Sequence, residues 1–200
     1  MERYKRNLKI LEENHVYSKN MEHDACGVGL VASTEGKKSR KIVEYGIEAL
    51  KAVWHRGAVD ADGKTGDGAG IHLEIPFDFF AEKIETKGHK HDGSEICIGM
   101  VFLPRNNFNS QESCKIIVEK ALTQNNFKIY GWRQVPINTK VLGEKANNNR
   151  PEITQILFKY NDKSLIDKAL ERKLYETRRK IEKEVIKNNL ESFYICSLSS

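Results

Sequence analysis

The chain has 200 residues, of which 39% are hydrophobic and 30% charged, a composition that supplies a buried core and excludes a wholly disordered chain. Its 33 basic and 28 acidic residues give a formal net charge of +5, and the two signs are interleaved, which argues against the concentrated basic patch of a nucleic-acid-binding protein. No stretch approaches the roughly 18 apolar residues of a membrane span. Residues 1–25 lack an apolar signal region and contain five acidic residues, unlike a transit peptide, so we expect a cytoplasmic protein without a membrane or nucleic-acid partner.

The predicted elements begin after a polar leader at residues 1–25. Short apolar or alternating runs bounded by turn residues predict strands, whereas apolar residues spaced three and four apart predict helices. In chain order, the first half predicts a buried strand at 26–33, a turn at 34–38, a helix with Val43, Ile47, Leu50 and Trp54 on one face that stops near 55–57, a glycine-rich loop at 57–70, a strand at 71–76, a short helix at 77–84 and a turn at 89–93.

The second half continues this alternation. It predicts a strand at 97–103, a helix with Ser110 as its N-cap, a strand at 127–136, a loop at 147–151, a strand at 153–160, a helix at 162–190 with Ile166, Leu170, Leu174, Ile181 and Val185 on one face, and a strand at 192–200. The many Lys and Arg residues of the long helix are spaced to pair with Glu, which favours a solvated face. Because the chain ends on an apolar strand, we expect the sequence to be cut short.

Four cysteines are present, at positions too far apart for a zinc-binding pattern: Cys26, Cys97, Cys114 and Cys196. The last three have apolar neighbours, so we expect them to be small buried hydrophobic residues. Cys26 differs because it lies at the junction between the polar leader and the first apolar run.

Residues 58–65 match a relaxed phosphate-loop pattern and also the start of a calcium-binding loop. A phosphate loop follows a strand and opens a helix, whereas this stretch follows a predicted helix, and Asp60 and Asp62 would repel phosphate. In a calcium loop, Lys64 would occupy a ligand position and Ile71 would stand where a bidentate glutamate is needed. We therefore predict neither ligand and no metal site.

Cys26 follows Ala25, and cleavage between the two would give the cysteine a free α-amino group beside its thiol. The pKa of an α-amine is about 7.7–8.0, so this amine can take the thiol proton at neutral pH and leave a nucleophilic thiolate. One residue would then supply both nucleophile and base. The alternative is that Cys26 is a buried, unreactive thiol.

Several segments together resemble one enzyme family. They lie at 23–29 (HDACGVG), 46–50 (GIEAL), 54–60 (WHRGAVD), 65–70 (TGDGAG) and 193–200 (FYICSLSS). In this order they closely resemble the start of the glutamate synthase large-subunit family, a class II glutamine amidotransferase domain of the N-terminal-nucleophile hydrolase type. The resemblance is dense from residue 23 to residue 76 and looser up to residue 200.

Carried over residue by residue, the resemblance implies that Ala25–Cys26 is the propeptide cleavage site and that Cys26 is the catalytic nucleophile toward L-glutamine. It places Arg56 and Gly57 in a loop that orders around bound glutamine. Alternatively, Arg56 is a cation at a helix C-terminus and the glycines up to Gly70 form plain tight turns. The Asn-Gly pair of the family's oxyanion hole does not occur in the sequence, so we expect this fragment alone to be a poor glutaminase.

The resemblance implies an α/β fold, the four-layer αββα sandwich of N-terminal-nucleophile hydrolases, here C-terminally incomplete, with residues 1–25 as propeptide and 26–200 as the N-terminal part of the domain. It implies that the released ammonia makes glutamate from 2-oxoglutarate elsewhere in the parent enzyme. FMN, an iron–sulfur cluster and a possible NAD(P)H-dependent small subunit are implied for that enzyme, and no cofactor for this fragment. The alternatives are an amidotransferase domain with a sugar-phosphate or phosphoribosyl acceptor, and a non-catalytic module whose basic helix binds an acidic partner.

Overall fold

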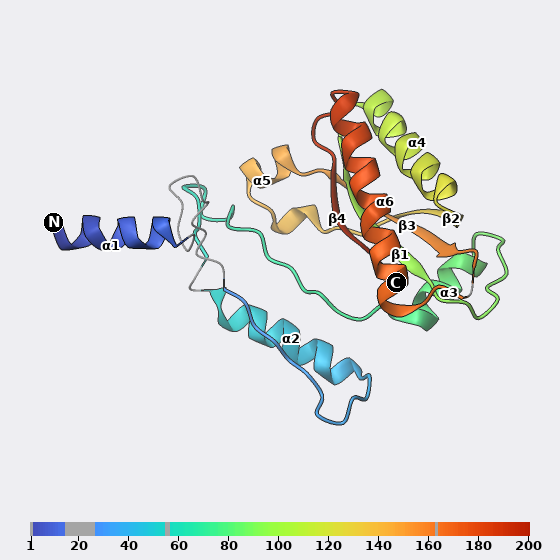
Figure 1. The fold of residues 1–200 in the computed structure, drawn as a ribbon, viewed down its shortest axis with the longest axis horizontal. Helices are drawn as coiled ribbons and strands as arrows, with labels where there is room; N and C mark the ends of the chain where they lie inside the picture. Colours follow the sequence, from blue (N-terminus) through green and yellow to red (C-terminus); the bar gives the residue numbers. More distant parts are fainter. Residues whose placement is uncertain (1, 15–26, 55–56, 163) are drawn as a thin grey trace. The chain divides into compact units, whose positions relative to one another are not determined.

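The computed structural model describes residues 2–14, 27–54, 57–162 and 164–200 (Figure 1). The chain divides into two compact units, one of Met1–Ala58 with Asp67–Ile71 and one of Val59–Gly66 with His72–Ser200. No helix within the described ranges combines the length and the apolar character that crossing a lipid bilayer requires.

The second unit is built on a four-stranded antiparallel sheet with the strand order β2-β3-β1-β4. The strands are β1 (Cys97–Leu103), β2 (Phe127–Gln134), β3 (Glu152–Tyr160) and β4 (Tyr194–Ser199). In the central pair, Val101 of β1 lies opposite Thr154 of β3. The four strands confirm the predicted runs from residue 97 onward, with ends that differ by one or two residues at most positions.

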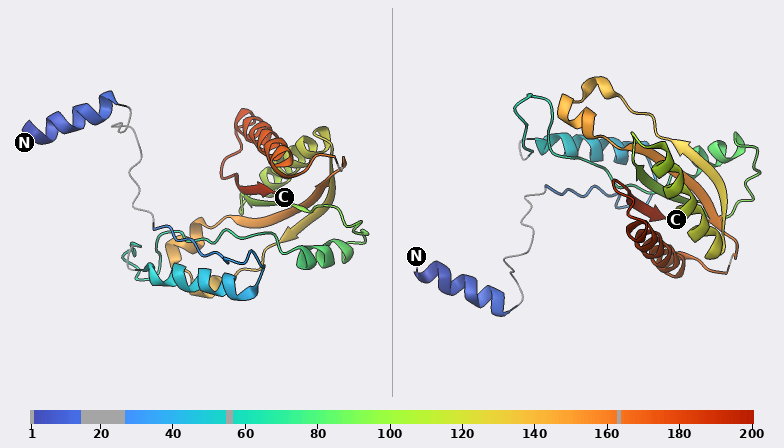
Figure 2. Two further views of the ribbon diagram at one scale, coloured as in Figure 1. Left: turned by 60° about the horizontal axis from the view of Figure 1, so that its bottom comes forward. Right: turned by 90° about the horizontal axis from the view of Figure 1, so that it is seen from above.

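Helices cover both faces of this sheet (Figure 2). On one face, α4 (Phe108–Gln124) and α6 (Asp167–Lys187) enclose the main core, to which β1 contributes Val101. On the other face, α3 (Phe77–Glu85) packs through Phe80 and Ile84 against a smaller cluster that contains Ile98 and Leu157. Val101 and Ile98 face opposite ways because successive strand residues alternate between the two faces. The predicted α/β class is therefore confirmed, and the sheet is antiparallel.

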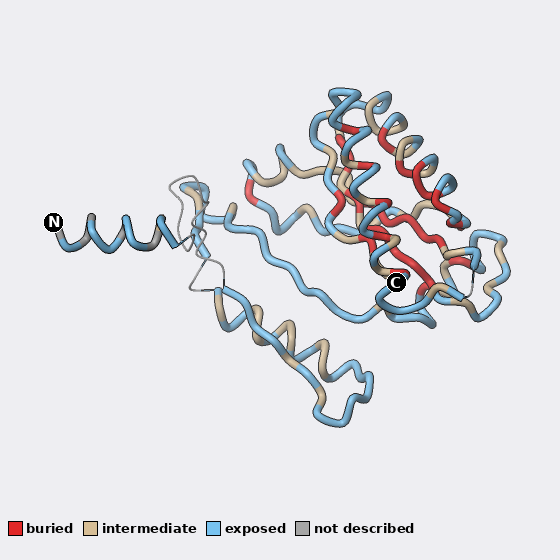
Figure 3. Tube along the Cα trace, in the orientation of Figure 1, coloured by how far each residue is buried: buried red, intermediate tan, exposed pale blue. Residues whose placement is uncertain are grey.

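The remaining helices contribute little to the core (Figure 3). They are α1 (Glu2–Glu13) and α2 (Arg40–Ala52) in the first unit, and the 3-10 turn η2 (Thr139–Val141) and α5 (Glu144–Asn149) in the second. The helix predicted after residue 38 is confirmed as α2, but it ends at Ala52, so Trp54 lies beyond it and is 77% exposed. None of the residues of α2 is buried.

Two predicted strands, at 26–33 and 71–76, do not form among the described residues. Residues 27–33 and 71–76 form neither helix nor strand, and Val28 and Leu30 are each 91% exposed. Strand backbone is stable when its N–H and C=O groups pair with a neighbouring strand. No such neighbour is found for these two segments among the described residues. An apolar sequence pattern alone was therefore not enough to predict a strand.

Local errors of prediction occur at three helix ends. The N-cap of α4 is Asn107, whose side chain accepts a hydrogen bond from the Ser110 backbone N–H, so Ser110 lies inside the helix instead of capping it. The predicted loop at 147–151 overlaps the end of α5. The long helix begins at Asp167, which leaves Ile166 as its N-cap and 57% exposed. Asn, Ser and Asp all cap helices well, so their sequence alone does not fix which one does.

The predicted charge pairing on the long helix is confirmed. Arg178 donates a hydrogen bond to Glu182 at 2.8 Å, and Arg172 lies 3.3 Å from Glu176, both at i, i+4 spacing. The buried stripe contains Leu170, Leu174, Ile181 and Val185 as predicted. The basic residues of these pairs are neutralised on the helix itself, which weakens the alternative of a surface for an acidic partner.

The cysteine prediction holds for two residues and is wrong for the third. Cys97 and Cys114 are fully buried in the main core, whereas Cys196 of β4 is exposed. In β4, Ile195 and Leu198 are buried, and an irregularity in the pairing with β1 leaves Cys196 without a register partner, on the exposed side. Burial raises the pKa of the Cys97 thiol to about 12.

We predict that a maleimide at pH 7 labels Cys196 in the native chain but leaves Cys97 and Cys114 unmodified until the chain is unfolded.

The raised pKa of Cys97 also predicts a pH dependence of the folding stability. The contribution of the Cys97 thiol is fully present below about pH 9 and is lost as the pH rises toward 12, because only the unfolded thiol then ionises. Peptide mapping by mass spectrometry measures the labelling. Repeating the labelling at pH 7 and pH 10 tests whether the stability falls as the pH rises. Native labelling of Cys97 would contradict the observed core.

Candidate functional site

The predicted site residues fall mostly outside the described part of the chain. Ala25, Cys26 and Arg56 are among the residues that the structure does not describe. Gly57 is described and exposed, and its backbone N–H donates to the carbonyl oxygen of Trp54 at 3.0 Å. The roles predicted for these four residues therefore remain predictions from sequence.

The glycine-rich segment that follows Gly57 forms a small hairpin at residues 59–66, which we call the 59–66 hairpin. Val59 pairs with Gly66 in an isolated antiparallel bridge, and the Asp60 N–H donates to the Thr65 carbonyl at 2.7 Å. The turn closes through a hydrogen bond from the Gly63 N–H to the Asp60 carbonyl at 2.9 Å. Gly63 has φ +68°, a conformation that favours glycine.

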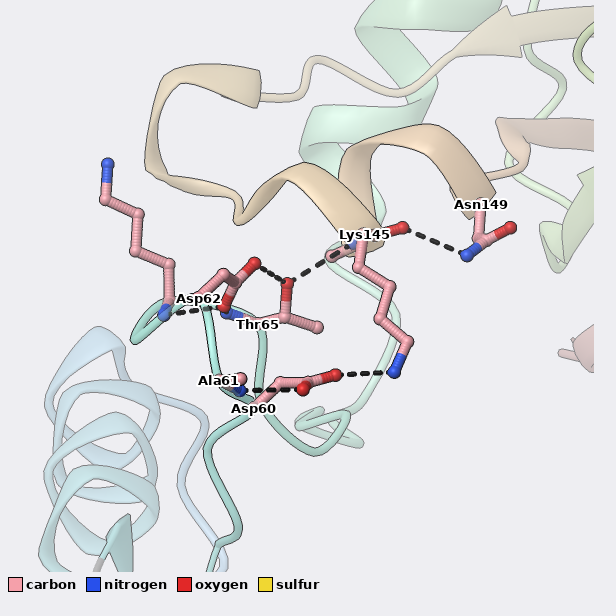
Figure 4. Close-up of polar contacts among 8 residues, drawn as sticks. Asp60, Ala61, Asp62, Thr65, Lys145 and Asn149 are labelled. Carbon is pink, nitrogen blue, oxygen red and sulfur yellow. Dashed lines mark hydrogen bonds and ion pairs between the residues drawn. The ribbon is translucent and has the colours of Figure 1, made fainter.

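Side chains of the hairpin contact α5 (Figure 4). Lys145 Nζ lies 2.5 Å from Asp60 Oδ2, in an ion pair between residues 85 positions apart. The Thr65 hydroxyl donates to Asp62 Oδ2 at 2.5 Å and accepts from the Ala146 backbone N–H at 3.4 Å. The hairpin is therefore stabilised both by its own hydrogen bonds and by contacts with α5.

The two hairpin carboxylates are strongly stabilised in their charged form. The hydrogen bond from Lys145 lowers the pKa of Asp60. Hydrogen bonds from the Thr65 hydroxyl and from the backbone N–H groups of Thr65 and Lys64 lower the pKa of Asp62 to about 2. Both carboxylates are thus ionised at neutral pH and hydrogen-bonded to groups of this chain.

An open hollow of about 430 Å³ lies where the hairpin meets α5. It is lined by Asp60, Ala61, Asp62, Glu144, Lys145, Asn148 and Asn149. Apart from Ala61, these residues have acidic, basic or amide side chains. None of them is among the residues predicted to act as the nucleophile or to bind glutamine. The hollow is therefore the solvated edge of the hairpin contact.

Lys145, Ala146 and Gly143 were not singled out from the sequence. They lie about 80 positions from the hairpin, between the strand predicted at 127–136 and the loop predicted at 147–151, where the sequence predicts no element. The short-range signal available was the pair of aspartates at 60 and 62, which predicts a charged loop but not its partner. Only the folded chain brings the two segments together.

Comparison with known proteins identifies the family. Residues 26–200 match the family described as glutamine amidotransferases class-II. The chain is 51% identical over 197 residues to the glutamate synthase [NADPH] large chain of Azospirillum brasilense, which covers 98% of this chain and 13% of that protein. It is 40% identical over 201 residues to the ferredoxin-dependent glutamate synthase of Cyanidium caldarium, covering 95% and 13%. For the enzyme of that name in Pyropia yezoensis, the identity is 37% over 195 residues, covering 96% and 12%.

The chain thus spans about an eighth of the length of these curated relatives, and it aligns with them along nearly all of its own length. The family match begins at Cys26, the residue at which the sequence changes from polar leader to apolar run, and continues to residue 200. The match covers far more than half of the chain. This chain belongs to the class II glutamine amidotransferases.

Proposed function

We propose that this chain is the glutamine-hydrolysing part of a glutamate synthase, with Cys26 as its nucleophile. The observation that carries the proposal is the family match over residues 26–200, which starts at Cys26 itself. The names of the relatives, all glutamate synthases, support the choice of acceptor reaction over a sugar-phosphate or phosphoribosyl acceptor.

The chemistry begins with removal of residues 1–25. The new α-amino group of Cys26 takes the thiol proton, and the thiolate attacks the carboxamide carbon of L-glutamine. The tetrahedral intermediate collapses with proton return to the amide nitrogen, and ammonia leaves while a γ-glutamyl thioester forms. Water then attacks the thioester and releases glutamate and the free thiol. Arg56 and Gly57 are proposed to lie in the loop that orders around the bound glutamine.

The four-layer αββα sandwich is part of the same proposal. Its support is the family match over residues 26–200. We propose that residues 27–33 and 71–76 contribute strands to the second sheet of the complete domain, which would cover the exposed side chains of Val28, Leu30, Ile71 and Leu73.

The cofactors and further partners are proposed for the longer protein. FMN and an iron–sulfur cluster would supply electrons for the reductive addition of ammonia to 2-oxoglutarate. They would lie in downstream synthase domains of the same chain. We propose that the parent enzyme is cytoplasmic. Within the described residues no three His, Cys, Asp or Glu side chains are grouped to hold a metal ion, and we assign no residue here to either group. The relatives are named for NADPH or for ferredoxin. For an NADPH-dependent parent enzyme, we propose an NAD(P)H-dependent small subunit as a further partner.

Processing is tested by the intact mass of the purified chain carrying its natural C-terminus. We expect a mass that corresponds to loss of residues 1–25, because an N-terminal amine on Cys26 is needed for the proposed base. A matched variant with Cys26→Ala reports whether cleavage depends on the thiol. An active protein that still carries the leader would overturn the amine-assisted mechanism.

A further inference from the structure

The short helix α5 lacks the features that keep a helix folded by itself. It has six residues, none of them buried, and its N-cap is Gly143, which has no side chain to bind the free N–H groups of the first turn. Helices shorter than about 12–15 residues are marginal in water, and tertiary packing of an apolar face supplies most of the stability of protein helices. Contacts from other parts of the chain must therefore stabilise α5.

The missing cap of α5 comes from the 59–66 hairpin (Figure 4). The Thr65 hydroxyl accepts a hydrogen bond from the Ala146 N–H at 3.4 Å, across 81 positions of sequence. A hydrogen bond from the Glu144 N–H contributes to the low pKa of Asp62, so the Asp62 carboxylate is a second acceptor at this end of the helix. Side chains of the hairpin thus replace the Ser, Thr, Asp or Asn that usually caps a helix.

The other end of α5 is stabilised by Arg105, which follows β1. The Arg105 guanidinium donates a hydrogen bond to the carbonyl oxygen of Asn147 at 2.9 Å. This carbonyl is one of the last four of the helix, which have no partner within the helix itself. Arg105 therefore stabilises α5 through a group of the helix and not through a group of the hairpin.

The 59–66 hairpin depends on α5 in turn. None of its residues is buried, and its two arms are joined at the isolated bridge between Val59 and Gly66. A two-stranded hairpin without a hydrophobic face is at best marginally stable in water. The ion pair between Lys145 Nζ and Asp60 Oδ2, at 2.5 Å, adds a link to α5. Each of the two elements therefore lacks apolar burial of its own and gains its polar partners from the other.

The backbones of the two elements also pack closely, which requires glycine at position 143. A Cβ added to Gly143 would overlap the Thr65 hydroxyl oxygen and the Asp62 carboxylate, and it would lie 2.5 Å from the Thr65 backbone nitrogen. Flexible side chains can move away from such an overlap, but the backbone nitrogen can do so only if the hairpin shifts.

We propose that the 59–66 hairpin and α5 form one order–disorder unit, in which each element is ordered only while the other is in place. The two open together, and the sheet of the second unit stays folded. Neither element contributes a residue to the two buried apolar clusters found among the described residues, so opening removes no core contact. Segments of low local stability are the ones that move in a folded protein, and this unit is such a segment.

The first test changes the hairpin and follows the helix, by amide hydrogen exchange with mass spectrometry on the full natural chain. Thr65→Val removes the hydroxyl that caps α5 and keeps the shape of the side chain. Exchange of peptides covering residues 143–149 should become about threefold to thirtyfold faster, as for the loss of a helix cap. Exchange of β1 (Cys97–Leu103) should stay within about twofold. The matched control is Lys64→Ala, at an exposed hairpin residue that bonds Asp62 through its backbone N–H, which alanine retains.

The second test changes the helix and follows the hairpin. Lys145→Ala should speed exchange of peptides covering residues 59–66 about twofold to fivefold, since exposed ion pairs are individually weak. Arg105→Ala should speed the same peptides at least about threefold, although Arg105 contacts α5 at the end opposite the hairpin. Lys140→Ala in η2, which also removes a positive charge from an exposed residue, should leave them within about twofold.

Three results would overturn the proposal. In the first, Thr65→Val speeds exchange in the hairpin but leaves α5 within twofold of the starting protein, so the elements are independent. In the second, exchange of β1 rises by the same factor as that of α5, so the sheet opens with them. In the third, residues 59–66 and 143–149 show no protection in the starting protein. If Thr65→Val fails to fold, Lys145→Ala and Arg105→Ala still decide between coupled and independent opening.

Discussion

Replacement of Cys26 by alanine is expected to lower the rate of glutamine hydrolysis by the full natural chain at least about 10³-fold, because the alanine side chain can form no thioester. Binding of glutamine should persist, since the proposed contacts of Arg56 and Gly57 are unchanged. Release of glutamate from glutamine measures the first effect. Isothermal titration with glutamine measures the second, on protein whose N-terminus has been checked by mass.

Cys196→Ala is the matched control for this experiment. Cys196 is the exposed cysteine of β4, and the mechanism gives it no role, so its replacement should leave the rate within about twofold of the starting protein. Full activity in Cys26→Ala would place the nucleophile elsewhere in the chain. Loss of activity in both variants would show that the assay reports on the integrity of the chain.

Phe158→Ala should destabilise the sheet of the second unit by about 3–5 kcal/mol, since it removes a large side chain from a closely packed core. Phe158 of β3 is fully buried, and its ring lies edge-on to Phe127 of β2 with 5.3 Å between centroids. Amide hydrogen exchange of β3 peptides, followed by mass spectrometry, measures the loss within a longer chain.

Phe108→Ala provides the control for the core substitution. Phe108 begins α4 and is 71% exposed, so its truncation should change protection of the sheet by less than about 0.5 kcal/mol. Similar losses of protection in the two variants would contradict the core described for the second unit.

The second unit was predictable because its elements carry strong local signals. The apolar run from Cys97 to Leu103 ends at Pro104, and it forms β1 with those bounds. The helix predicted from residue 77 is confirmed as α3, and the stripe of the long helix is buried as its 3.6-residue period predicts. In these cases the pattern of burial and the local propensity agree.

The remainder depends on partners that a sequence does not specify. The apolar run after Cys26 predicts a strand, but strand formation requires a neighbour, and Val28 is 91% exposed. The family resemblance predicts a role for Cys26 from its surrounding motif, whereas the link between Asp60 and Lys145 joins residues 85 positions apart without a shared motif. Long-range pairing of this kind is decided by the fold as a whole.

The separation between Asp60 and Lys145 also sets an order of events during synthesis on the ribosome. At about 5–20 residues per second, the hairpin leaves the ribosome roughly 4–17 s before α5 can reach it. During that interval the Asp60 carboxylate lacks its Lys145 partner, and the hairpin is held only by its own hydrogen bonds. The contact between the hairpin and α5 can thus form only after both segments have been made.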